Sequence, residues 1–331
     1  MESIWFKVKV WWYKQTHFEF FSIPKLYFPI ALYALFVAIQ LRDFYWIKYV
    51  NPRIYLSGIV EHSKNYLLKK IPSQYSISSV FGEKGISLHE LVEKITKASL
   101  EFPLVIKPDC GSRGLNIYKV TSFEELEQKY DNARNYVIQE YADYKNEYAV
   151  FYIRYPNEPT GKVTSLVQKE FMKFIGDGNT TLWNLISHHP RAWLYTKRMQ
   201  EVFSNKELAS VVPKDKVISA SFVGAHSGGT IFLDKNHLIT EKISRVFDAI
   251  TQEIPEFYYG RYDVKAHSLK DLENGNFKVL ELNGALGEPV HMYHPGTSIT
   301  KGYSILFSNW FQMSKIARLN KKRGVSVYKK T

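Results

Sequence analysis

Two short segments in the last quarter of the chain, GRYDVK and VLELNG, hold residue types that could bind a metal ion and a phosphate. Asp263 and Glu281 are predicted at the ends of two neighbouring strands, and Asn283 follows two residues after Glu281. Because residues i and i+2 of a strand share a face, Glu281 and Asn283 point the same way, and Arg261 lies on the same face as Asp263. Mg²⁺ prefers such oxygen ligands together with phosphate oxygens, and Arg261 could reach a transferred phosphate. The alternative is a pair of strand-end acids without a function.

A loop that could hold phosphates occurs in IKPDCGSRG, from Ile106 to Gly114. A predicted buried strand ends at Lys107, and the loop after it contains Gly111, Ser112, Arg113 and Gly114. The backbone N–H groups of such a loop can bond phosphate oxygens, while Lys and Arg add positive charge. The segment lacks the GK[ST] of a Walker A motif and does not match GxGxxG. A glycine-containing hairpin with exposed basic residues is the alternative.

An adenine could be held at the end of the strand predicted in YVIQEY. A hinge between two lobes offers backbone groups to the base, and a carboxylate seven residues farther on could hold the ribose hydroxyls. The residues concerned are Gln139, Glu140, Tyr141 and Glu147. The alternative is that they are ordinary surface residues.

The sequence GDGNTT, from Gly176 to Thr181, predicts a sharp turn because two glycines flank an aspartate. Thr180 could cap the helix that follows at LWNLI. Lys169 and Lys173 precede the turn, so one interpretation is a mobile flap that brings lysines over phosphates. A hairpin that leads into a helix is the other.

Strand and helix patterns are mixed around these segments and predict an α+β fold. Ser87 and Glu90 have the spacing of a capping box for a helix over residues 88–100, and Ser122 and Glu125 repeat it. Strands are predicted at residues 104–106, 136–141, 148–155, 163–171 and 278–282, and a helix at 238–250. We expect an N-terminal segment 1–70, a central lobe 71–139, a C-terminal lobe 140–313 and a basic tail 314–331.

The N-terminal segment contains an uncharged apolar run, Leu26–Leu41, which is shorter than the ~20 residues of a straight membrane-spanning helix. Pro29 fits the first turn of a helix over this run. Aromatic and basic residues flank the run, as they do at an interfacial membrane anchor. They are Trp11, Trp12, Tyr13, Tyr27, Tyr45 and Trp46, with Lys14, Lys25, Arg42 and Lys48. The alternative is a helical hairpin that packs on the body of the protein.

Charge and cysteine content narrow the function classes. The 331 residues carry a net charge of +12, but residues 1–75 hold ten basic and four acidic residues and residues 314–331 hold seven basic residues and no acid. The body between them is therefore nearly neutral, which argues against a nucleic-acid-binding face, whereas the basic ends suit an anionic membrane surface or an acidic partner. A single cysteine, Cys110, rules out an internal disulfide framework and favours a reducing, cytosolic environment.

In the order in which they occur, these motifs resemble those of the ATP-grasp superfamily, over about residues 100–295. The lysine loop, the hinge acids, the GDG loop, Arg-x-Asp and Glu-x-Asn follow one another with the family's rough spacing. The stretch FVGAHSGGTIFLD is similar to the Gly-Gly segment of cyanophycin-synthetase-type enzymes, and D-alanine–D-alanine ligases are also similar. The resemblance implies two α+β lobes that hold ATP between them. It also implies a ligase that activates a carboxylate as an acyl phosphate and joins it to an amine or a thiol.

The resemblance also implies a role for each nucleotide-binding residue. Lys107 would contact the ATP phosphates, the loop Cys110–Gly114 would cover them, and Lys64 is the candidate for a second, upstream lysine. The adenine hinge would be lined by Gln139, Glu140 and Tyr141, and the ribose would be held by Glu147.

The catalytic and metal-binding roles follow in the same way. Lys169 or Lys173 would reach the γ-phosphate, and Arg261 would stabilise phosphoryl transfer and the tetrahedral stage. Mg²⁺, with Mn²⁺ as an alternative ion, would be bound by Asp263, Glu281 and Asn283.

Two departures from the family bear on the substrate. Residues 1–75 lack the βαβ pattern of the usual substrate-binding domain, so D-alanine dipeptide synthesis is not supported. The segment LNGALGEPVHMYHP lacks the usual proline-glycine ending, and His291, Tyr293 and His294 either face the acceptor or belong to a polar loop.

Three functions therefore compete. The first is a cytoplasmic ligase, peripheral on the inner face of the membrane, that acts on a cell-envelope or lipid-linked substrate. The second is a soluble biosynthetic peptide ligase whose N-terminus forms a homodimer, and the third is a non-catalytic ATP-binding module. In the first two, the partners are a small-molecule carboxylate and an amine.

Overall fold

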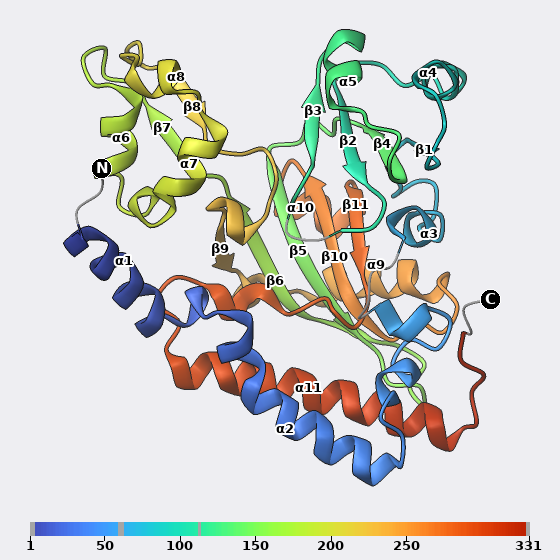
Figure 1. Cartoon of the computed structure of the whole chain (residues 1–331). Coiled ribbons are helices and arrows are strands. Elements are labelled where there is room, and N and C mark those ends of the chain that lie inside the picture. The colour runs from blue at the N-terminus through green and yellow to red at the C-terminus, as the bar shows by residue number, and fades with distance from the viewer. Residues whose placement is uncertain (1–3, 59–62, 112–113, 329–331) are drawn as a thin grey trace.

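The structure is a computed structural model that describes residues 4–58, 63–111 and 114–328. It contains two α+β lobes, an inserted subdomain and an outer layer of helices (Figure 1). The predicted α+β class with a helical, apolar N-terminal segment is confirmed.

The smaller lobe is an antiparallel sheet with the strand order β1-β4-β2-β3. Its strands are β1 (Ser79–Gly82), β2 (Leu104–Pro108), β3 (Tyr118–Val120) and β4 (Tyr136–Glu140), and its helices are α4 (Leu88–Lys97) and α5 (Phe123–Lys129). The predicted capping box of Ser87 and Glu90 begins α4. Side chains alternate along a strand, so Ile106 and Ile138 lie in the core with α4 and α5, whereas Lys107 and Gln139 point to the opposite face.

The larger lobe is a five-stranded antiparallel sheet with the order β11-β10-β5-β6-β9. Its strands are β5 (Asn146–Ile153), β6 (Lys162–Glu170), β9 (Ile231–Asp234), β10 (Tyr259–Ala266) and β11 (Lys278–Asn283). One face is covered by α3 (Lys64–Leu68), α9 (Glu241–Gln252) and α10 (Leu269–Asn274), around core residues such as Phe247 and Tyr262. The other face carries polar residues at one end and apolar residues at the other.

A small subdomain with its own core lies between β6 and β9. It contains β7 (Lys173–Ile175), α6 (Leu182–His188), η4 (Ala192–Tyr195), α7 (Thr196–Val202), α8 (Asn205–Ala209) and β8 (Val217–Ser219). Thr181 caps α6 by accepting from the Asn184 amide, so the cap lies one residue later than predicted at Thr180. Thr180 instead donates to Asp177, because the aspartate organises the turn.

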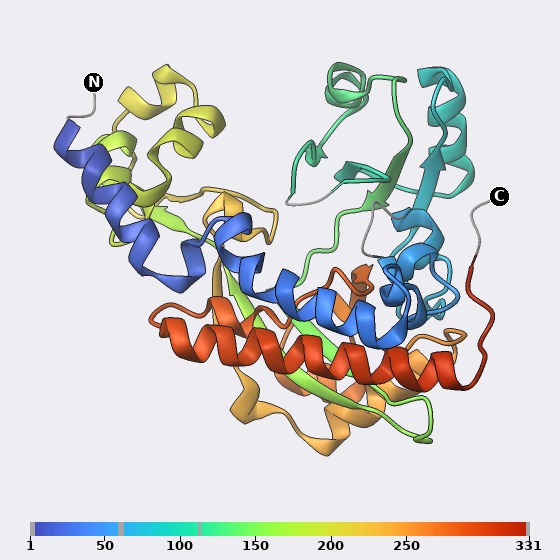
Figure 2. The same cartoon turned by 60° about the horizontal axis from the view of Figure 1, so that its bottom comes forward.

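The outer layer consists of α1 (Ile4–Thr16), η1 (Phe18–Phe20), α2 (Ile23–Leu41) and α11 (Ile299–Lys322), and α2 and α11 lie side by side (Figure 2). This layer packs on the apolar end of the larger sheet, where Phe151 and Tyr259 meet η2 (Trp46–Tyr49) and α11. Pro29 lies inside α2 and Pro24 occupies its first turn, so the placement of Pro29 in the first turn was wrong. The domain boundaries stay a prediction, although α11 runs through the one placed at 313/314.

A buried ion pair connects the outer layer to the inserted subdomain. Arg191 donates through both terminal nitrogens to the Glu19 carboxylate, and His226 Nε2 lies 3.3 Å from Glu19 Oε2. Burial alone would raise the pKa of Glu19, but the hydrogen bonds from His226 and Arg191 lower it. The carboxylate is therefore ionised, and the subdomain depends on η1 to neutralise Arg191.

Replacing Glu19 with alanine is expected to lower the free energy of unfolding by about 3 kcal/mol, because the buried Arg191 cation would lose its partner. Urea denaturation would measure this loss. Glu201→Ala in the same subdomain is the control: its partner Arg198 is exposed, so its cost should stay below about 1 kcal/mol. Equal losses in the two variants would contradict a structural role for the Glu19 pair.

Candidate active site

The strand register brings the residues of the two C-terminal motifs together. In the pairing of β10 with β11, Asp263 lies opposite Glu281 and Arg261 lies opposite Asn283. Residues directly opposite each other in an antiparallel pair share a face of the sheet. All four side chains therefore belong to one face, and they occupy its polar end.

The same face continues across β5 and β6. Glu147 on β5 lies opposite Lys265 on β10 and opposite Lys169 on β6. Lys169 Nζ is 2.7 Å from Glu147 Oε1 and 3.0 Å from Asp263 Oδ1. Lys169 thus links two buried carboxylates from neighbouring strands.

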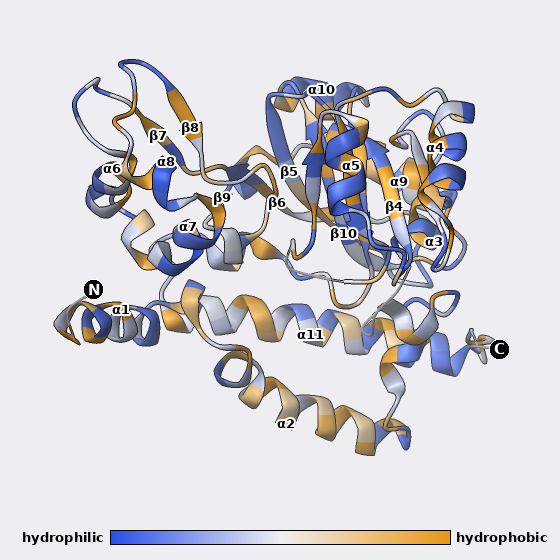
Figure 3. Ribbon diagram, turned by 45° about the horizontal axis from the view of Figure 1, so that its top comes forward, coloured by the Kyte–Doolittle hydropathy of each residue, from blue (hydrophilic) through white to orange (hydrophobic). Residues whose placement is uncertain are grey.

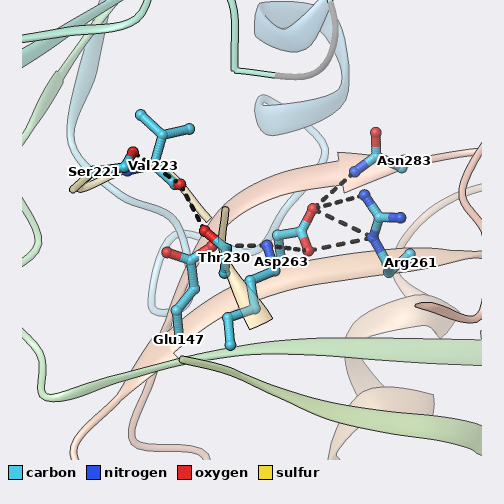
Figure 4. Close-up of polar contacts among 8 residues, drawn as sticks. Glu147, Ser221, Val223, Thr230, Arg261, Asp263 and Asn283 are labelled. Atoms are coloured by element: carbon cyan, nitrogen blue, oxygen red, sulfur yellow. Dashed lines mark hydrogen bonds and ion pairs between the residues drawn. The ribbon is translucent and has the colours of Figure 1, made fainter. Parts of the chain in front are cut away.

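Asp263 is surrounded by donors (Figure 4). Arg261 donates through one terminal nitrogen to Asp263 Oδ2 at 3.1 Å, and the Asn283 amide donates to the same oxygen at 3.1 Å. Burial would raise the pKa of Asp263, but the charges of Arg261 and Lys169 lower it. Burial would likewise lower the pKa of Lys169, but Asp263 and Glu147 raise it. Asp263 is therefore ionised and already neutralised by cations.

Two further lysines, from elements outside the larger sheet, reach the polar end of this face. Lys107 on β2 of the smaller lobe donates to the Leu280 carbonyl oxygen at 3.0 Å. Lys64 on α3 donates to the Gly111 carbonyl oxygen at 2.6 Å, and its Nζ is 3.9 Å from Glu281 Oε1. Lys107 of the smaller lobe and Lys64 of α3 therefore bring further cations to the polar end of the larger sheet.

The charge of Lys107 depends on pH within an accessible range. Burial lowers its pKa, the charge of Glu281 raises it and that of Lys64 lowers it again, and the net result is a pKa of about 8. Lys107 is thus protonated below about pH 8 and neutral above it. If it binds phosphates, a nucleotide should bind less tightly in alkaline solution.

We expect the affinity for ATP to fall on the order of ten-fold between about pH 7 and pH 9.5, as Lys107 loses its proton. Isothermal titration at the two pH values would measure it. The Lys107→Met variant provides the control, because it should bind ATP weakly with little pH dependence. A parent affinity that stays constant across this range would contradict a phosphate contact from Lys107.

The predicted adenine hinge lies at the end of β4. Gln139 is buried on the face that also carries Lys107, and its Nε2 has no hydrogen-bond partner among the described residues. The ring of Tyr141 is flanked by the ammonium groups of Lys119 and Lys265, at 3.6 and 4.9 Å from its centroid. Glu140 is half-buried beside them. An unpaired buried amide donor fits a ring nitrogen of a base, which is a hydrogen-bond acceptor.

The predicted phosphate loop is described only in part, because Ser112 and Arg113 lie outside the described residues. Gly111 precedes them and Gly114 follows with a φ of +70°. A Cβ on Gly114 would lie 2.7 Å from Val223, and a Cβ on Gly224 would lie 2.1 Å from Glu147 Oε1. The backbone around Gly224 therefore passes directly over Glu147 and Lys169 and also contacts the phosphate loop. This is the stretch that resembled the Gly-Gly segment of cyanophycin-type enzymes.

The two flap lysines are placed differently. Lys169 lies in the ion cluster, whereas Lys173 is exposed on the two-stranded ribbon of β7 and β8. Asp177 in the GDG turn bonds the Thr180 hydroxyl and the amides of Asn179 and Thr180, which lower its pKa to about 2. The aspartate therefore holds the shape of the turn.

Sequence reasoning missed Glu288. Its backbone oxygen accepts from Arg261 at 3.5 Å, and its carboxylate accepts from the Tyr293 hydroxyl at 2.8 Å. Burial raises its pKa to about 7. The two histidines of this segment are engaged elsewhere, His291 with the Ser165 hydroxyl and His294 with the Asp234 amide, which favours the polar-loop interpretation for them. Only the position of Glu288, five residues after Asn283, could have indicated it.

Comparison with known proteins gives similarity at the level of solved structures. No family model and no curated protein sequence matches this chain. A bifunctional glutathione synthetase from Pasteurella multocida is similar at 18% identity and a TM-score of 0.40, over 80% of this chain and 38% of that one. D-alanine–D-alanine ligase from Bacillus anthracis is similar at 15% identity and a TM-score of 0.41, over 79% of this chain and 69% of that one. The VanG D-Ala:D-Ser ligase from Enterococcus faecalis is similar at 13% identity and a TM-score of 0.41, over 86% of this chain and 64% of that one.

This chain thus spans well under half of the glutathione synthetase and about two thirds of the two ligases. With TM-scores below 0.5, an assignment of activity has to rest on the residues of the site. The three enzymes named here are ATP-grasp enzymes, the superfamily that the motifs of this chain resemble.

Proposed function

We propose that this protein is an ATP-dependent ligase of the ATP-grasp type, which activates a carboxylate as an acyl phosphate and joins it to an amine. The supporting observation is that four cations gather at the polar end of the larger sheet. Lys169 and Arg261 contact Asp263, Lys64 lies 3.9 Å from Glu281, and Lys107 donates to the neighbouring Leu280 carbonyl oxygen. A triphosphate and a carboxylate repel each other in water, so a site that reacts one with the other needs several cations placed in advance. Four cations from four separate elements, α3, β2, β6 and β10, meet that need.

The nucleotide would lie between the lobes. Lys107 and Lys64 would bind its phosphates, the loop at Gly111–Gly114 would cover them, and the unpaired amide of Gln139 would bond the base. The proposal keeps Glu140 and Tyr141 at the adenine and Glu147 at the ribose. Lys169 is the better of the two flap candidates for the γ-phosphate, because Lys173 is exposed on the ribbon.

Asp263, Glu281 and Asn283 would hold Mg²⁺, with Mn²⁺ as the alternative. The described residues contain no group of three or more His, Cys, Asp or Glu that could hold an ion alone. Two carboxylates and one amide fit Mg²⁺ nevertheless, because it usually takes its remaining ligands from phosphates and water. When bound, Mg²⁺ neutralises charge on the phosphates.

The remaining residues suit the chemistry that follows. A substrate carboxylate oxygen would bond the γ-phosphorus as ADP leaves, and Arg261 would stabilise the charge on the transferred phosphate. The amine nitrogen would then bond the acyl carbon as phosphate leaves. Glu288, with a pKa near 7, would accept the proton that the acceptor's ammonium group must lose to become the attacking amine.

The substrate class and location are a further part of the proposal. The apolar outer layer favours a cell-envelope or lipid-linked substrate and a peripheral location on the inner face of the cytoplasmic membrane. The alternative is a soluble biosynthetic ligase in which the same surface forms a homodimer. Thiol acceptors remain within the proposal, since a thiolate attacks an acyl phosphate in the same way.

Trapping with hydroxylamine tests the chemistry without knowledge of the acceptor. The chain would be incubated with ATP, Mg²⁺ and hydroxylamine across a panel of amino acids, peptides and envelope precursors. A hydroxamate formed from one carboxylate, with equimolar ADP, would support the ligase. ATP binding without ADP or hydroxamate across the panel would instead favour a binding module, and no ATP binding would contradict the proposal.

A further inference from the structure

The helix α2 lies at the edge of the molecule and is largely hydrophobic along its length (Figure 3), and several of its apolar side chains are exposed. The exposed residues follow helical spacing and occupy an arc of roughly 100° on one side of the helix. They are Phe28, Leu32, Leu35, Phe36 and Ile39, each between 48% and 69% exposed. A stripe of this size on one helix indicates a surface that is covered in use.

Tryptophans extend this surface along α1. Trp5, Trp11 and Trp12 are all more than half exposed, and Val8 lies between them. Tryptophan is the residue that most favours the boundary between water and lipid, because its ring is apolar and its N–H remains solvated. The composition of α1 therefore favours a lipid interface over a second protein surface.

The charge of these helices also distinguishes a lipid surface from a second copy of the chain as the partner. Between Ile4 and Leu41 the one acidic residue is Glu19, which is buried against Arg191, and α11 contains no Asp or Glu. The basic residues on these helices and at the end of α2 are Lys7, Lys9, Lys14, Lys25, Arg42, Lys301, Lys315, Arg318, Lys321 and Lys322. A second copy of the chain would bring the same positive charge and would be repelled. An anionic lipid surface would be attracted.

The opposite side of α2 fixes how the helix can lie. Leu26, Ile30 and Val37 are buried, and Tyr33 bonds Ser314 of α11 through its hydroxyl at 2.8 Å. Ile23–Leu41 is long and apolar enough to cross a membrane by length and composition. Crossing would break these contacts, whereas lying flat leaves them intact.

We propose that the outer face of α2, with the tryptophans of α1, docks in the interfacial region of an anionic lipid bilayer, parallel to its plane and without crossing it. Phe18 between the two helices packs on Tyr293, the partner of Glu288, so this part of the candidate site lies near the docked helices. An acceptor or carboxylate carried by a lipid could enter from there. The docking itself rests on the surface alone and does not depend on the ligase proposal.

Vesicle co-sedimentation of the full chain, without ATP, tests this surface. Vesicles of phosphatidylcholine with about one third phosphatidylglycerol should bind the parent, and pure phosphatidylcholine should bind it less. The triple variant Phe28→Ser, Leu32→Ser and Phe36→Ser should bind about 100-fold less tightly. The control is the triple variant Phe123→Ser, Ile175→Ser and Val217→Ser. It changes three exposed apolar residues of the smaller lobe and of the β7–β8 ribbon, and it should bind as the parent does.

A charge variant gives a second test in case the triple variant folds poorly. This variant combines Lys7→Gln, Arg42→Gln and Lys322→Gln. It should bind more weakly to the anionic vesicles and bind unchanged to pure phosphatidylcholine. The proposal is overturned if the parent stays in the supernatant, or if both variants bind as the parent does. It is also overturned if the parent forms a stable lipid-free dimer that the apolar triple variant dissociates, since a second copy would then cover the face.

Discussion

Replacing Glu281 with alanine is expected to reduce substrate-stimulated ADP formation by at least about 1,000-fold. Glu281 lies opposite Asp263 across the β10–β11 pair, so its removal would leave the proposed metal site with one carboxylate. Mg²⁺ would then bind the nucleotide in solution but would lack its position in the site. A coupled assay of ADP, with the carboxylate found by the hydroxylamine trap, would measure the loss.

The fold should tolerate this change. Lys64 would lose a contact at 3.9 Å but would keep its hydrogen bond to the Gly111 carbonyl oxygen. Glu158→Ala, in an exposed loop, serves as the control and should turn over as the parent does. If the Glu281→Ala variant keeps its thermal stability and more than about a tenth of the parent turnover, Glu281 is not a ligand of the metal ion.

The arrangement of the C-terminal motifs could be predicted because it depends on local rules. Spacing of two along a strand places Glu281 with Asn283 and Arg261 with Asp263, and the structure pairs the two strands as neighbours. The strands predicted at 104–106, 136–141 and 163–171 also occur, as β2, β4 and β6, because their apolar patterns and turn residues are local signals. The chemical roles of these residues stay predictions.

Other features depend on contacts between distant segments and have no local signal. Lys64 reaches the site because α3 packs against β11, more than 200 residues later in the chain. The need for glycine at 224 comes from the backbone passing over Glu147, which no spacing in the sequence reveals. The sequence also could not show that Asp263 is neutralised by Lys169, because this depends on the register across three strands.

That neutralisation leads to the second large expected effect. Replacing Lys169 with methionine should lower the free energy of unfolding by about 3 to 5 kcal/mol, because the buried Glu147 would lose the ammonium group that it bonds and Asp263 would keep only Arg261 as a cation. Lys162→Met at the exposed start of the same strand is the matched control and should cost within about 0.5 kcal/mol. Urea denaturation at neutral pH would measure both.

The pH dependence of this loss follows from its cause. Burial raises the pKa of Asp263, and the charges of Arg261 and Lys169 lower it, so without Lys169 its pKa in the folded state should rise from the parent's value. An ionised Asp263 therefore stabilises the parent more than the variant, so the deficit should shrink as the pH falls from neutrality into the acidic range where carboxyl groups become protonated. A deficit that stays constant over this range would indicate lost packing instead of stranded charge.

Melting temperatures measured with and without Mg²⁺ distinguish the structural role of Lys169 from its role beside the proposed metal site. In the parent, Asp263 is neutralised by Lys169 and Arg261, so Mg²⁺ without nucleotide should leave the melting temperature unchanged, and ATP with Mg²⁺ should raise it. ATP would draw the two cations to its phosphates and so free the carboxylate for the metal ion. In Lys169→Met, Asp263 has lost one of its two cations, so Mg²⁺ alone should raise the melting temperature. If Mg²⁺ alone stabilised the parent as much as the variant, the metal ion would bind independently of this carboxylate, and the exchange of partners at Asp263 would be wrong.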